Sequence, residues 1–305
     1  MPARRILVIK HGALGDIIQG LDGYASLRAG HPDAHLAVLT TAPFAGLFAA
    51  MPFFDEVLVD HRASLLNLLQ TLRIRGVLHN GWDRIYDFQC SRRTRRYFAH
   101  LAPRGVETVG IHPGASHPLP EMAHLNNRDR MITTAVTGGC PATEAETGWL
   151  AGAGENVPRD RVILIPGCSP AKPEKRWPAG HYADLARMLI SEGHRVALVG
   201  TAVDRAAGDV IMAGAEGCTD YIGKTTLPEL AAMLAAARVV VGNDTGPVFM
   251  AARLGAPTLM LMSRHTDPGM SAPYGPAAAW MREDAIEKIT PAMVLDHLRT
   301  MNPGL

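Results

Sequence analysis

Two glycine-rich segments, one in each half of the chain, place polar side chains where they can bind phosphate and hydroxyl groups. Residues 239–261 read VVVGNDTGPVFMAARLGAPTLML, which is typical of a buried strand, a turn, a small-residue helix and a second strand. The turn brings Asp244, the hydroxyl of Thr245 and the amide of Gly246 to the start of that helix. Unpaired N–H groups and the positive end of the helix dipole favour an anionic ligand there.

The second segment, HGALGD at residues 11–16, follows the first apolar run of the chain. Lys10 ends that run, two glycines permit a tight turn, and Asp16 stands just before a helical pattern. Asp16 either caps the helix or acts as a general base that removes a proton from an acceptor hydroxyl. Both interpretations are compatible, because the carboxyl edge of a parallel sheet faces the ligand crevice. Two such turns indicate a ligand held between two domains.

A basic loop in the second half is a further candidate for phosphate binding. It reads IPGCSPAKPEKRWP at residues 165–178, and its Ser169, Lys175 and Arg176 precede a predicted helix. Lysine offers a compact charge suited to phosphate, and arginine offers a bidentate fork. A solvated loop with ordinary helix-start chemistry is the alternative.

Three more polar residues stand near predicted strand ends in this half. Asp204 follows the strand end at residues 198–200, where an acidic residue either binds a ribose hydroxyl or caps a helix. Thr266 and Asp267 belong to the Gly-, Pro- and Ser-rich loop 263–276, whose composition is typical of a mobile or ligand-closing loop.

A cluster of arginines marks the first half. Arg92, Arg93, Arg95 and Arg96 crowd the start of one predicted helix, and Arg62 is a weaker partner for them. Guanidinium groups so close together suit the phosphates or carboxylates of an acidic acceptor. A solvated basic face is the alternative for any single one of them.

Several common sequence signatures are absent, and each absence narrows the chemistry. No Gly-x-Gly-x-x-Gly follows the first strand, and no Gly-x-x-x-x-Gly-Lys-Ser/Thr occurs, which argues against a dinucleotide oxidoreductase and a P-loop protein. No Asp-x-Asp occurs either, and the thirteen histidines show no metal-ligand spacing. We therefore expect no metal or other cofactor, so that another group must neutralise any leaving phosphate.

Composition sets the broad class. The 305 residues suit two domains, and 47% hydrophobic with 19% charged residues describes an ordinary folded protein. A net charge of +1 gives no reason to expect nucleic-acid binding. The four cysteines form no Cys-x-x-Cys pair, so reduced thiols in a cytoplasmic protein are expected. No stretch approaches the ~20 apolar residues needed to span a bilayer, so any membrane contact should be peripheral.

Short apolar runs alternate with helical patterns, which is typical of parallel, doubly wound sheets. We expect an α/β fold of two Rossmann-like domains that face a central cleft, covering residues 1–155 and 156–305, with the Gly- and Pro-rich segment 137–158 as linker. The expected strands are 5–10, 35–40, 56–60, 84–88, 107–111, 161–166, 194–200, 220–222, 238–242 and 257–261. The expected helices are 17–29, 44–51, 63–74, 92–101, 121–134, 178–192, 204–213, 227–237, 247–254 and 291–301.

The order of four segments resembles glycosyltransferase family 9, the bacterial ADP-heptose:lipopolysaccharide heptosyltransferases and their relatives. These segments are RRILVIKHGALGDIIQGL at 4–21, the basic loop at 165–178, IGKTTLPELAAML at 222–234, and the segment 239–261. The resemblance runs from about Arg5 to Gly275. It implies the two-domain GT-B fold, with the acceptor held by the N-terminal domain and the nucleotide sugar by the C-terminal one.

The resemblance also implies an activity: inverting transfer of a heptose or similar sugar from an ADP-sugar to a lipopolysaccharide-core or related glycan acceptor, without a metal. By position, Asp16 matches the catalytic base and Lys175 the lysine that neutralises the donor diphosphate. The expected partners are a nucleotide sugar, an acidic glycolipid or glycan, and the inner face of the bacterial inner membrane. The expected donor-binding residues are Ser169, Arg176, Asp204, Thr225, Asp244, Thr245, Gly246, Thr266 and Asp267. The expected acceptor-binding residues are Lys10, Gly15, Arg62, Arg92, Arg93, Arg95 and Arg96.

Two departures from the family pattern concern the donor. The family usually reads Asp-Thr-Gly-Pro-Met-His-Leu, and Phe249 stands where that histidine belongs. Arg264 and His265 replace the Gly-Pro that usually precedes Thr-Asp-Pro. A phenyl ring cannot donate to a phosphate, so a GT-B-like sugar-nucleotide epimerase and a non-catalytic nucleotide-sugar-binding homologue remain alternatives. The oligomeric state is left open.

Overall fold

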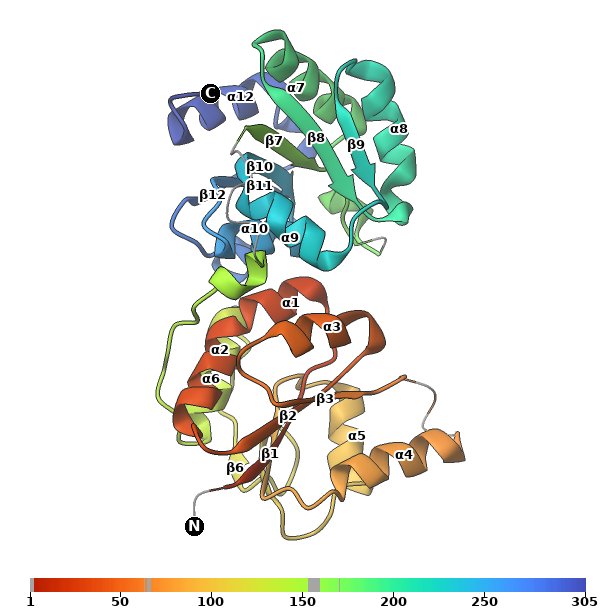
Figure 1. Ribbon diagram of the computed structural model, residues 1–305, viewed down its shortest axis with the longest axis vertical. Coiled ribbons are helices and arrows are strands. Elements are labelled where there is room, and N and C mark those ends of the chain that lie inside the picture. The colour runs from red at the N-terminus through yellow and green to blue at the C-terminus, as the bar shows by residue number, and fades with distance from the viewer. Residues whose placement is uncertain (1–2, 63, 65–66, 153–159, 170) are drawn as a thin grey trace. The chain divides into compact units, whose positions relative to one another are not determined.

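The computed structural model describes residues 3–62, 64, 67–152, 160–169 and 171–305. The chain divides into two compact units, Met1–Trp149 and Leu150–Leu305, each with its own six-stranded parallel sheet (Figure 1). The prediction of two α/β Rossmann-like halves is confirmed. The predicted boundary between residues 155 and 156 lies outside the described residues.

The sheet of the first unit has the order β3-β2-β1-β4-β5-β6, and all its pairs are parallel. Its central strand β1 is covered on both faces, and Ile6, Leu7, Val8 and Ile9 are all fully buried. This double coverage explains why the strand reads as an unbroken apolar run. The strands are β1 (Arg5–Ile9), β2 (His35–Thr40), β3 (Glu56–Val59), β4 (Arg84–Asp87), β5 (Glu107–Gly110) and the unexpected two-residue β6 (His117–Pro118).

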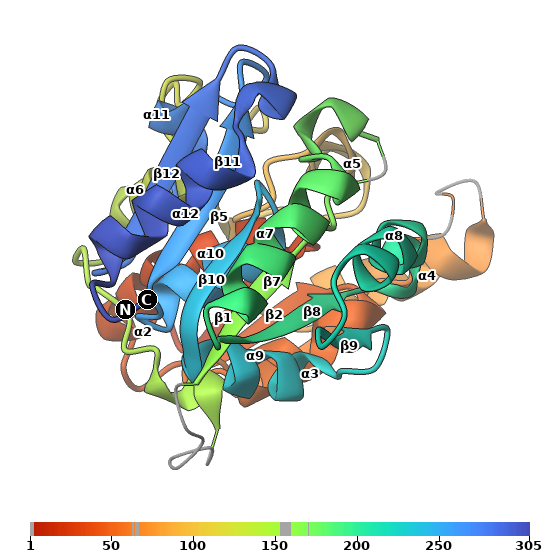
Figure 2. The same ribbon diagram turned by 90° about the horizontal axis from the view of Figure 1, so that it is seen from above.

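Helices cover both faces of this sheet (Figures 1 and 2). Ile74 and Leu78 of one helix and Tyr97 of another pack with Leu7 and Ile9 of β1 in a single core cluster on one face. On the other face, the longest helices are α2 and α6, which pack against each other. The helices are α1 (Leu14–Gln19), α2 (Leu21–Gly30), α3 (Ala42–Ala50), α4 (Leu68–Leu78), α5 (Arg92–His100) and α6 (Asn127–Thr137).

Three predicted helices of this unit begin or divide elsewhere. The single helix expected at 17–29 is two helices, α1 and α2, which meet at Gly20. The helix expected at 63–74 begins at Leu68, because Asn67 accepts a hydrogen bond from the amide of Gln70 and caps it; residues 63, 65 and 66 lie outside the described part. The helix expected at 121–134 begins at Asn127, where Asn126 caps the amide of Asp129.

Gly23→Ala is expected to destabilise the first unit by about 1–3 kcal/mol, because an added methyl group overlaps the backbone of α6. A Cβ at Gly23 would lie 2.6 Å from Cβ and 2.8 Å from the carbonyl carbon of Met131. Gly46 on α3 is the matched control: a Cβ there meets nothing within 4 Å, and alanine favours a helix interior over glycine by about 0.5–1 kcal/mol. Urea unfolding measures both. Equal stability of G23A and the wild type would contradict the close packing of α2 on α6.

The second unit repeats the architecture with the strand order β12-β11-β10-β7-β8-β9. The edge strand β12 was not expected, because its half-buried and exposed residues lack a continuous apolar run. The strands are β7 (Arg161–Ile165), β8 (Arg195–Gly200), β9 (Thr219–Ile222), β10 (Ala237–Asn243), β11 (Thr258–Ser263) and β12 (Ala278–Glu283). The helices are α7 (Ala179–Ser191), α8 (Arg205–Gly214), α9 (Leu227–Ala235), α10 (Gly246–Arg253), α11 (Pro268–Ser271) and α12 (Pro291–Met301). Short 3-10 turns occur at Gly148–Ala151, Pro173–Lys175, Ala202–Asp204 and Ile286–Lys288.

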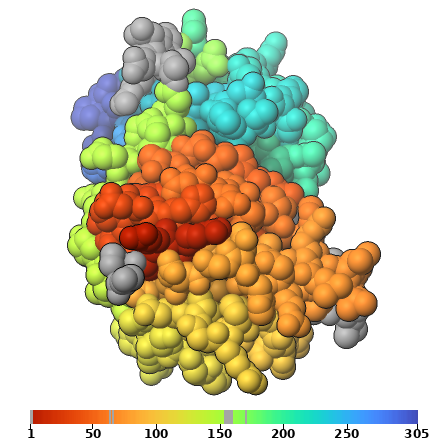
Figure 3. Space-filling view, turned by 60° about the horizontal axis from the view of Figure 1, so that its bottom comes forward, coloured from red at the N-terminus to blue at the C-terminus, as the bar shows by residue number. Residues whose placement is uncertain are grey.

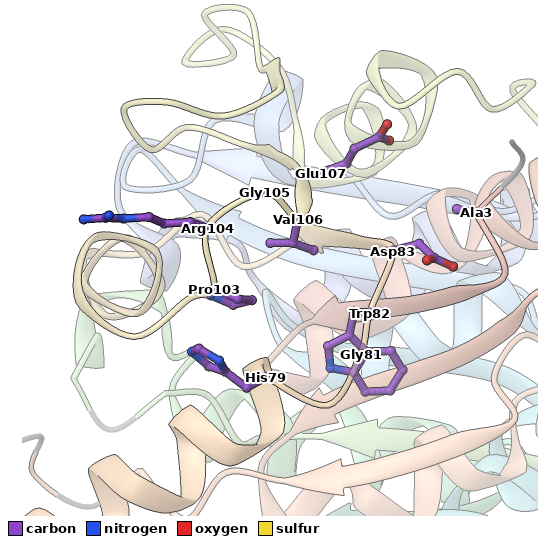
Figure 4. Close-up of a pocket in the computed structure, with 10 residues that line it drawn as sticks. All are labelled: Ala3, His79, Gly81, Trp82, Asp83, Pro103, Arg104, Gly105, Val106 and Glu107. Atoms are coloured by element: carbon purple, nitrogen blue, oxygen red, sulfur yellow. The ribbon is translucent and has the colours of Figure 1, made fainter.

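A cavity of about 490 Å³ opens at the amino-terminal end of the first sheet (Figure 4). Its two carboxylates are already engaged: Asp83 accepts hydrogen bonds from the amides of Arg4 and Arg5, and Glu107 pairs with Arg84. The amino ends of β1, β4 and β5 border this cavity, so it lies at the sheet edge opposite to Lys10 and Asp16.

Within the described residues, none of the helices has both the length and the apolar character needed to cross a membrane.

Candidate functional site

Asp16 lies on the first turn of α1, just beyond the carboxyl end of β1. Its Oδ1 accepts a hydrogen bond of 2.7 Å from Nδ2 of Asn127 on α6, and its Oδ2 accepts one of 3.2 Å from the amide of Ala13. The prediction that Asp16 is the capping residue before the helix is therefore wrong in position: Ala13 is the N-cap, and Asp16 is the third helical residue, reaching back to the N-cap amide. The carboxylate is half-buried and held on two sides.

Lys10, at the end of β1, is only 3% exposed. Burial lowers the pKa of its ammonium group, and the nearby charges of Asp16, Cys90 and Asp87 oppose that shift. The predicted pair Lys10 and Asp16 thus lies at one sheet edge.

A second buried carboxylate, Asp60, organises the same edge and was missed from the sequence. Its Oδ2 accepts a hydrogen bond of 2.5 Å from the hydroxyl of Tyr97 and lies 3.0 Å from Nε2 of His11. Its Oδ1 accepts bonds from the Gln70 side chain and the Arg62 amide. Burial raises the pKa of Asp60, but these contacts outweigh it and hold that pKa well below its usual range. Asp60 therefore stays ionised and joins α4 and α5 to the sheet edge.

Asp87, the last residue of β4, is fully buried, and the sequence prediction missed it as well. The amides of Gln89 and Cys90 donate to its Oδ1 at 3.1 and 2.8 Å. Burial nevertheless dominates and raises the pKa of Asp87 to about 6. Their positions in the sequence could have revealed both carboxylates as site candidates. Asp60 directly follows β3 and Asp87 ends β4, so both lie at the carboxyl edge of the sheet.

Asp87 should give the free energy of unfolding a pH dependence. Because its pKa is raised from 3.8 to about 6 in the folded chain, the unfolded chain loses the proton first, and stability falls as the pH rises from about 4 to about 6. Asp87→Asn removes this penalty. Relative to the wild type, the variant should gain about 2 kcal/mol more at about pH 7 than at about pH 4. Urea unfolding at both pH values measures it, with the exposed Asp33→Asn as control. A gain of the same size at both pH values would count against the raised pKa.

The predicted arginine cluster divides into two kinds of residue. Arg93 turns toward the buried network, where its Nε contacts the hydroxyl of Tyr97 and lies 3.5 Å from Asp60. Arg92, Arg95 and Arg96 are exposed, and so is Arg62, which lies after β3. Gly15, a predicted acceptor contact, lies beside Asp16 on α1.

The second unit builds its edge around Asn243, the last residue of β10, which is fully buried. Its Oδ1 accepts hydrogen bonds from the amide of Trp177 at 2.9 Å and the hydroxyl of Tyr182 at 3.2 Å. Its Nδ2 donates to the carbonyls of Pro166 and Gly167. A fully satisfied buried amide fixes the loop 166–178 against the end of β10.

That loop brings Lys175 onto Asp244, two residues predicted separately for the donor side. Nζ of Lys175 lies 2.5 Å from Oδ2 of Asp244, and both side chains are about one-tenth exposed. The hydroxyl of Thr266 donates to the same oxygen at 3.2 Å. Thr245 caps α10 with its backbone only, since its side chain makes no capping hydrogen bond. The amide of Gly246 thus stands at a helix N-terminus beside a lysine, an arrangement suited to an anion.

The other predicted donor residues have mixed surroundings. Ser169 is exposed, and Thr225 is half-buried between β9 and α9. Arg176 donates to the carbonyl of Cys168 and lies 4.0 Å from Asp204. Asp204 is buried and accepts hydrogen bonds from the amide and hydroxyl of Thr201, which holds the short turn Ala202–Asp204, but its side chain makes no capping hydrogen bond to α8. Asp267 is exposed and caps α11 through the amide of Gly269, so part of the loop 263–276 is a short helix.

Phe249, the main departure from the family pattern, is 4% exposed on α10 and packs inside the second unit. Arg264 and His265 are exposed just after β11. Among the described residues, no three His, Cys, Asp or Glu side chains are grouped in a way that could hold a metal ion.

Each of the two α/β units thus carries polar side chains at the carboxyl edge of its sheet, a held carboxylate in the first and a lysine beside a helix N-terminus in the second. The chain belongs to glycosyltransferase family 9 (heptosyltransferase), whose family model matches residues 122–293. It is 32% identical to lipopolysaccharide heptosyltransferase 2 of Salmonella typhimurium, over 97% of this chain and 98% of that protein.

Solved structures of similar proteins share the fold. One is the E. coli ADP-heptose lps heptosyltransferase II, with a TM-score of 0.76 and 24% identity, over 97% of this chain and 98% of that one. Another is an E. coli heptosyltransferase solved with ADP, with a TM-score of 0.80 and 19% identity, over 97% and 99%. The GT-B fold implied by the resemblance is confirmed by these likenesses.

Proposed function

We propose that the protein is an inverting glycosyltransferase that moves a heptose, or a similar sugar, from an ADP-sugar to a lipopolysaccharide-core or related glycan acceptor. The observation that carries the proposal is the Asp244 carboxylate just before α10, which accepts hydrogen bonds from both Lys175 and Thr266. The names of the relatives, and the ADP bound to one structural neighbour, support an ADP-sugar as donor.

On the acceptor side, Asp16 removes the proton from the attacking hydroxyl. The oxygen forms a bond to the anomeric carbon as the bond from that carbon to the diphosphate oxygen breaks, so the configuration inverts and ADP leaves. Asn127 and the amide of Ala13 position the carboxylate. The exposed Arg62, Arg92, Arg95 and Arg96 suit the negative charges of an acidic acceptor.

On the donor side, Lys175 and the amide of Gly246 stabilise the charge that develops on the departing diphosphate. Asp244 serves chiefly to hold the ammonium group at this position, since a carboxylate by itself would repel a diphosphate. Arg176, Ser169 and Thr225 line the same edge and are proposed to contact the donor, while Asp204 and Asp267 act through the turns that they hold. The positive charge comes from protein groups, so we propose that transfer proceeds without a metal.

An assay of ADP release tests the proposed function. The purified protein is incubated with ADP-heptose and a heptose-deficient core oligosaccharide in the presence of EDTA, and ADP is measured with and without the acceptor. We expect ADP release that requires the acceptor and persists in EDTA. Release of nucleotide and an epimerised sugar without acceptor would identify an epimerase instead. Donor binding without any ADP release would identify a non-catalytic binder, and activity that requires added Mg²⁺ would contradict metal independence.

A further inference from the structure

Helix α4 leaves three large apolar side chains in solvent. Leu68, Leu69 and Leu72 are 70%, 79% and 53% exposed. The other large apolar residues found exposed in the described part are spread over separate elements, as is ordinary for a folded protein. A cluster of three leucines on a turn and a half of helix is unusual, and clustered apolar exposure marks an interaction surface.

These leucines are not needed to attach the helix to its unit. The opposite side of α4 supplies the buried residues Gln70, Ile74 and Leu78, and Ile74 and Leu78 belong to the core under the sheet. Gln70 also donates to Asp60. The helix is therefore held by one face and presents the other to an external partner. Figure 3 shows the orange segment that includes α4 at the surface of the first unit.

Charge identifies that partner as an anionic surface. Arg73 and Arg75 are exposed on the same helix. Residues 61–82 and 88–106, which contain α4 and α5, include eight arginines and no aspartate or glutamate. Asp60, which directly precedes the first of these ranges, is buried and already in contact with His11, Tyr97 and Arg93. Apolar side chains flanked by arginines are typical of helices that lie in the interface of a bilayer with anionic lipids.

We propose that Leu68, Leu69, Leu72, Arg73 and Arg75, the α4 patch, dock the first unit on an anionic phospholipid bilayer. The leucines enter the headgroup region while the arginines contact lipid phosphates. This proposal rests on the proposed function, because a glycolipid acceptor lies in such a bilayer. The position of the α4 patch also supports this proposal. The chain enters α4 after Asp60, which lies at the same sheet edge as Asp16.

Vesicle sedimentation tests the α4 patch. The full chain is mixed with vesicles of phosphatidylethanolamine and phosphatidylglycerol, or of phosphatidylcholine alone. The variant L68Q/L69Q/L72Q should bind the anionic vesicles at least about tenfold more weakly than the wild type. The variant R73Q/R75Q should bind them about 25-fold more weakly, at about fivefold per arginine, with little change on phosphatidylcholine. The controls V210Q and R187Q/R195Q, exposed positions of the second unit, should bind like the wild type.

A second readout separates this proposal from the proposed function. All α4 variants should transfer sugar to a delipidated core oligosaccharide at the wild-type rate and lose transfer to the glycolipid embedded in vesicles. Wild-type binding by the α4 variants, or a wild type that transfers sugar but ignores vesicles, would overturn the docking surface. So would light scattering that shows a wild-type dimer and monomeric leucine variants, because a second copy would then cover the patch. A wild type without any transfer would overturn the proposed function alone.

Discussion

Asp16→Asn should slow sugar transfer by about 10²–10⁴-fold, the usual contribution of a general base. The amide side chain has the same shape as the carboxylate but cannot accept a proton. Its oxygen can still accept the hydrogen bond from Nδ2 of Asn127, which in the native chain is 2.7 Å long. The local structure should therefore persist, and the loss should appear in kcat with little change in donor affinity. Steady-state transfer kinetics and calorimetric titration with ADP-heptose measure the two quantities.

The control for this experiment is Asp33→Asn, a change of the same kind at an exposed carboxylate in the turn between α2 and β2. It should transfer sugar like the wild type. Asn127→Ala adds a second test, because it leaves the base in place and removes only its positioning group. That variant should lose part of the activity and shift the pH profile of kcat/KM. Near-normal transfer by D16N would remove Asp16 as the base.

Lys175→Ala should lower kcat/KM for transfer by about 10²–10³-fold, as is typical when one group that stabilises a developing charge is lost. It should also weaken binding of ADP-heptose by about 10–100-fold, because a charge-assisted hydrogen bond contributes about 1.5–3 kcal/mol. Lys175→Arg should not restore the rate, since the space beside Asp244 is fitted to a compact ammonium group 2.5 Å from the carboxylate. Lys288→Ala, at an exposed lysine of the same unit, is the matched control.

A double-mutant cycle of Lys175 and Asp244 can distinguish a positioning role of Asp244 from direct contact with the donor. If Asp244 acts by holding Lys175, then Asp244→Asn should cost much less in the Lys175→Ala background than in the wild type. Additive effects of the two substitutions on kcat/KM would show instead that Asp244 contacts the donor independently. Unchanged donor affinity in Lys175→Ala would contradict the proposed role of the lysine.

The sequence was most informative where apolar residues recur with the period of a strand or a helix. The strand at His35–Thr40 and the helix at Pro291–Met301 have the bounds that the pattern predicts. Lys175, Asp244 and Thr266 were expected on one sheet edge, and they lie there because they follow the strands β7, β10 and β11, which are neighbours in one parallel sheet. Their direct contacts were not predicted. Residues at neighbouring strand ends share an edge by topology, and apolar periodicity is enough to reveal it.

Contacts that join distant segments could not be predicted in this way. Asn127 reaches Asp16 across 111 positions of sequence, and no periodicity links α6 to α1. The network around Asp60 depends on how α4 and α5 pack, and the start of α4 depends on a cap at Asn67 that a run of leucines obscures. The edge strand β12 lacks the apolar run of a central strand. Phe249, where the family usually has a histidine, is buried, and its effect on donor binding stays a prediction.

The most direct test of the account is the structure of the product formed from ADP-heptose and a heptose-deficient core oligosaccharide. The glycan is analysed by mass spectrometry for the added sugar and by NMR for the anomeric configuration, with the wild type, D16N and K175A side by side. The account predicts one added heptose per acceptor, with the configuration opposite to that of the donor, in the wild type and almost none in the two variants. A product with retained configuration, or an unchanged acceptor beside free or epimerised sugar, would contradict it.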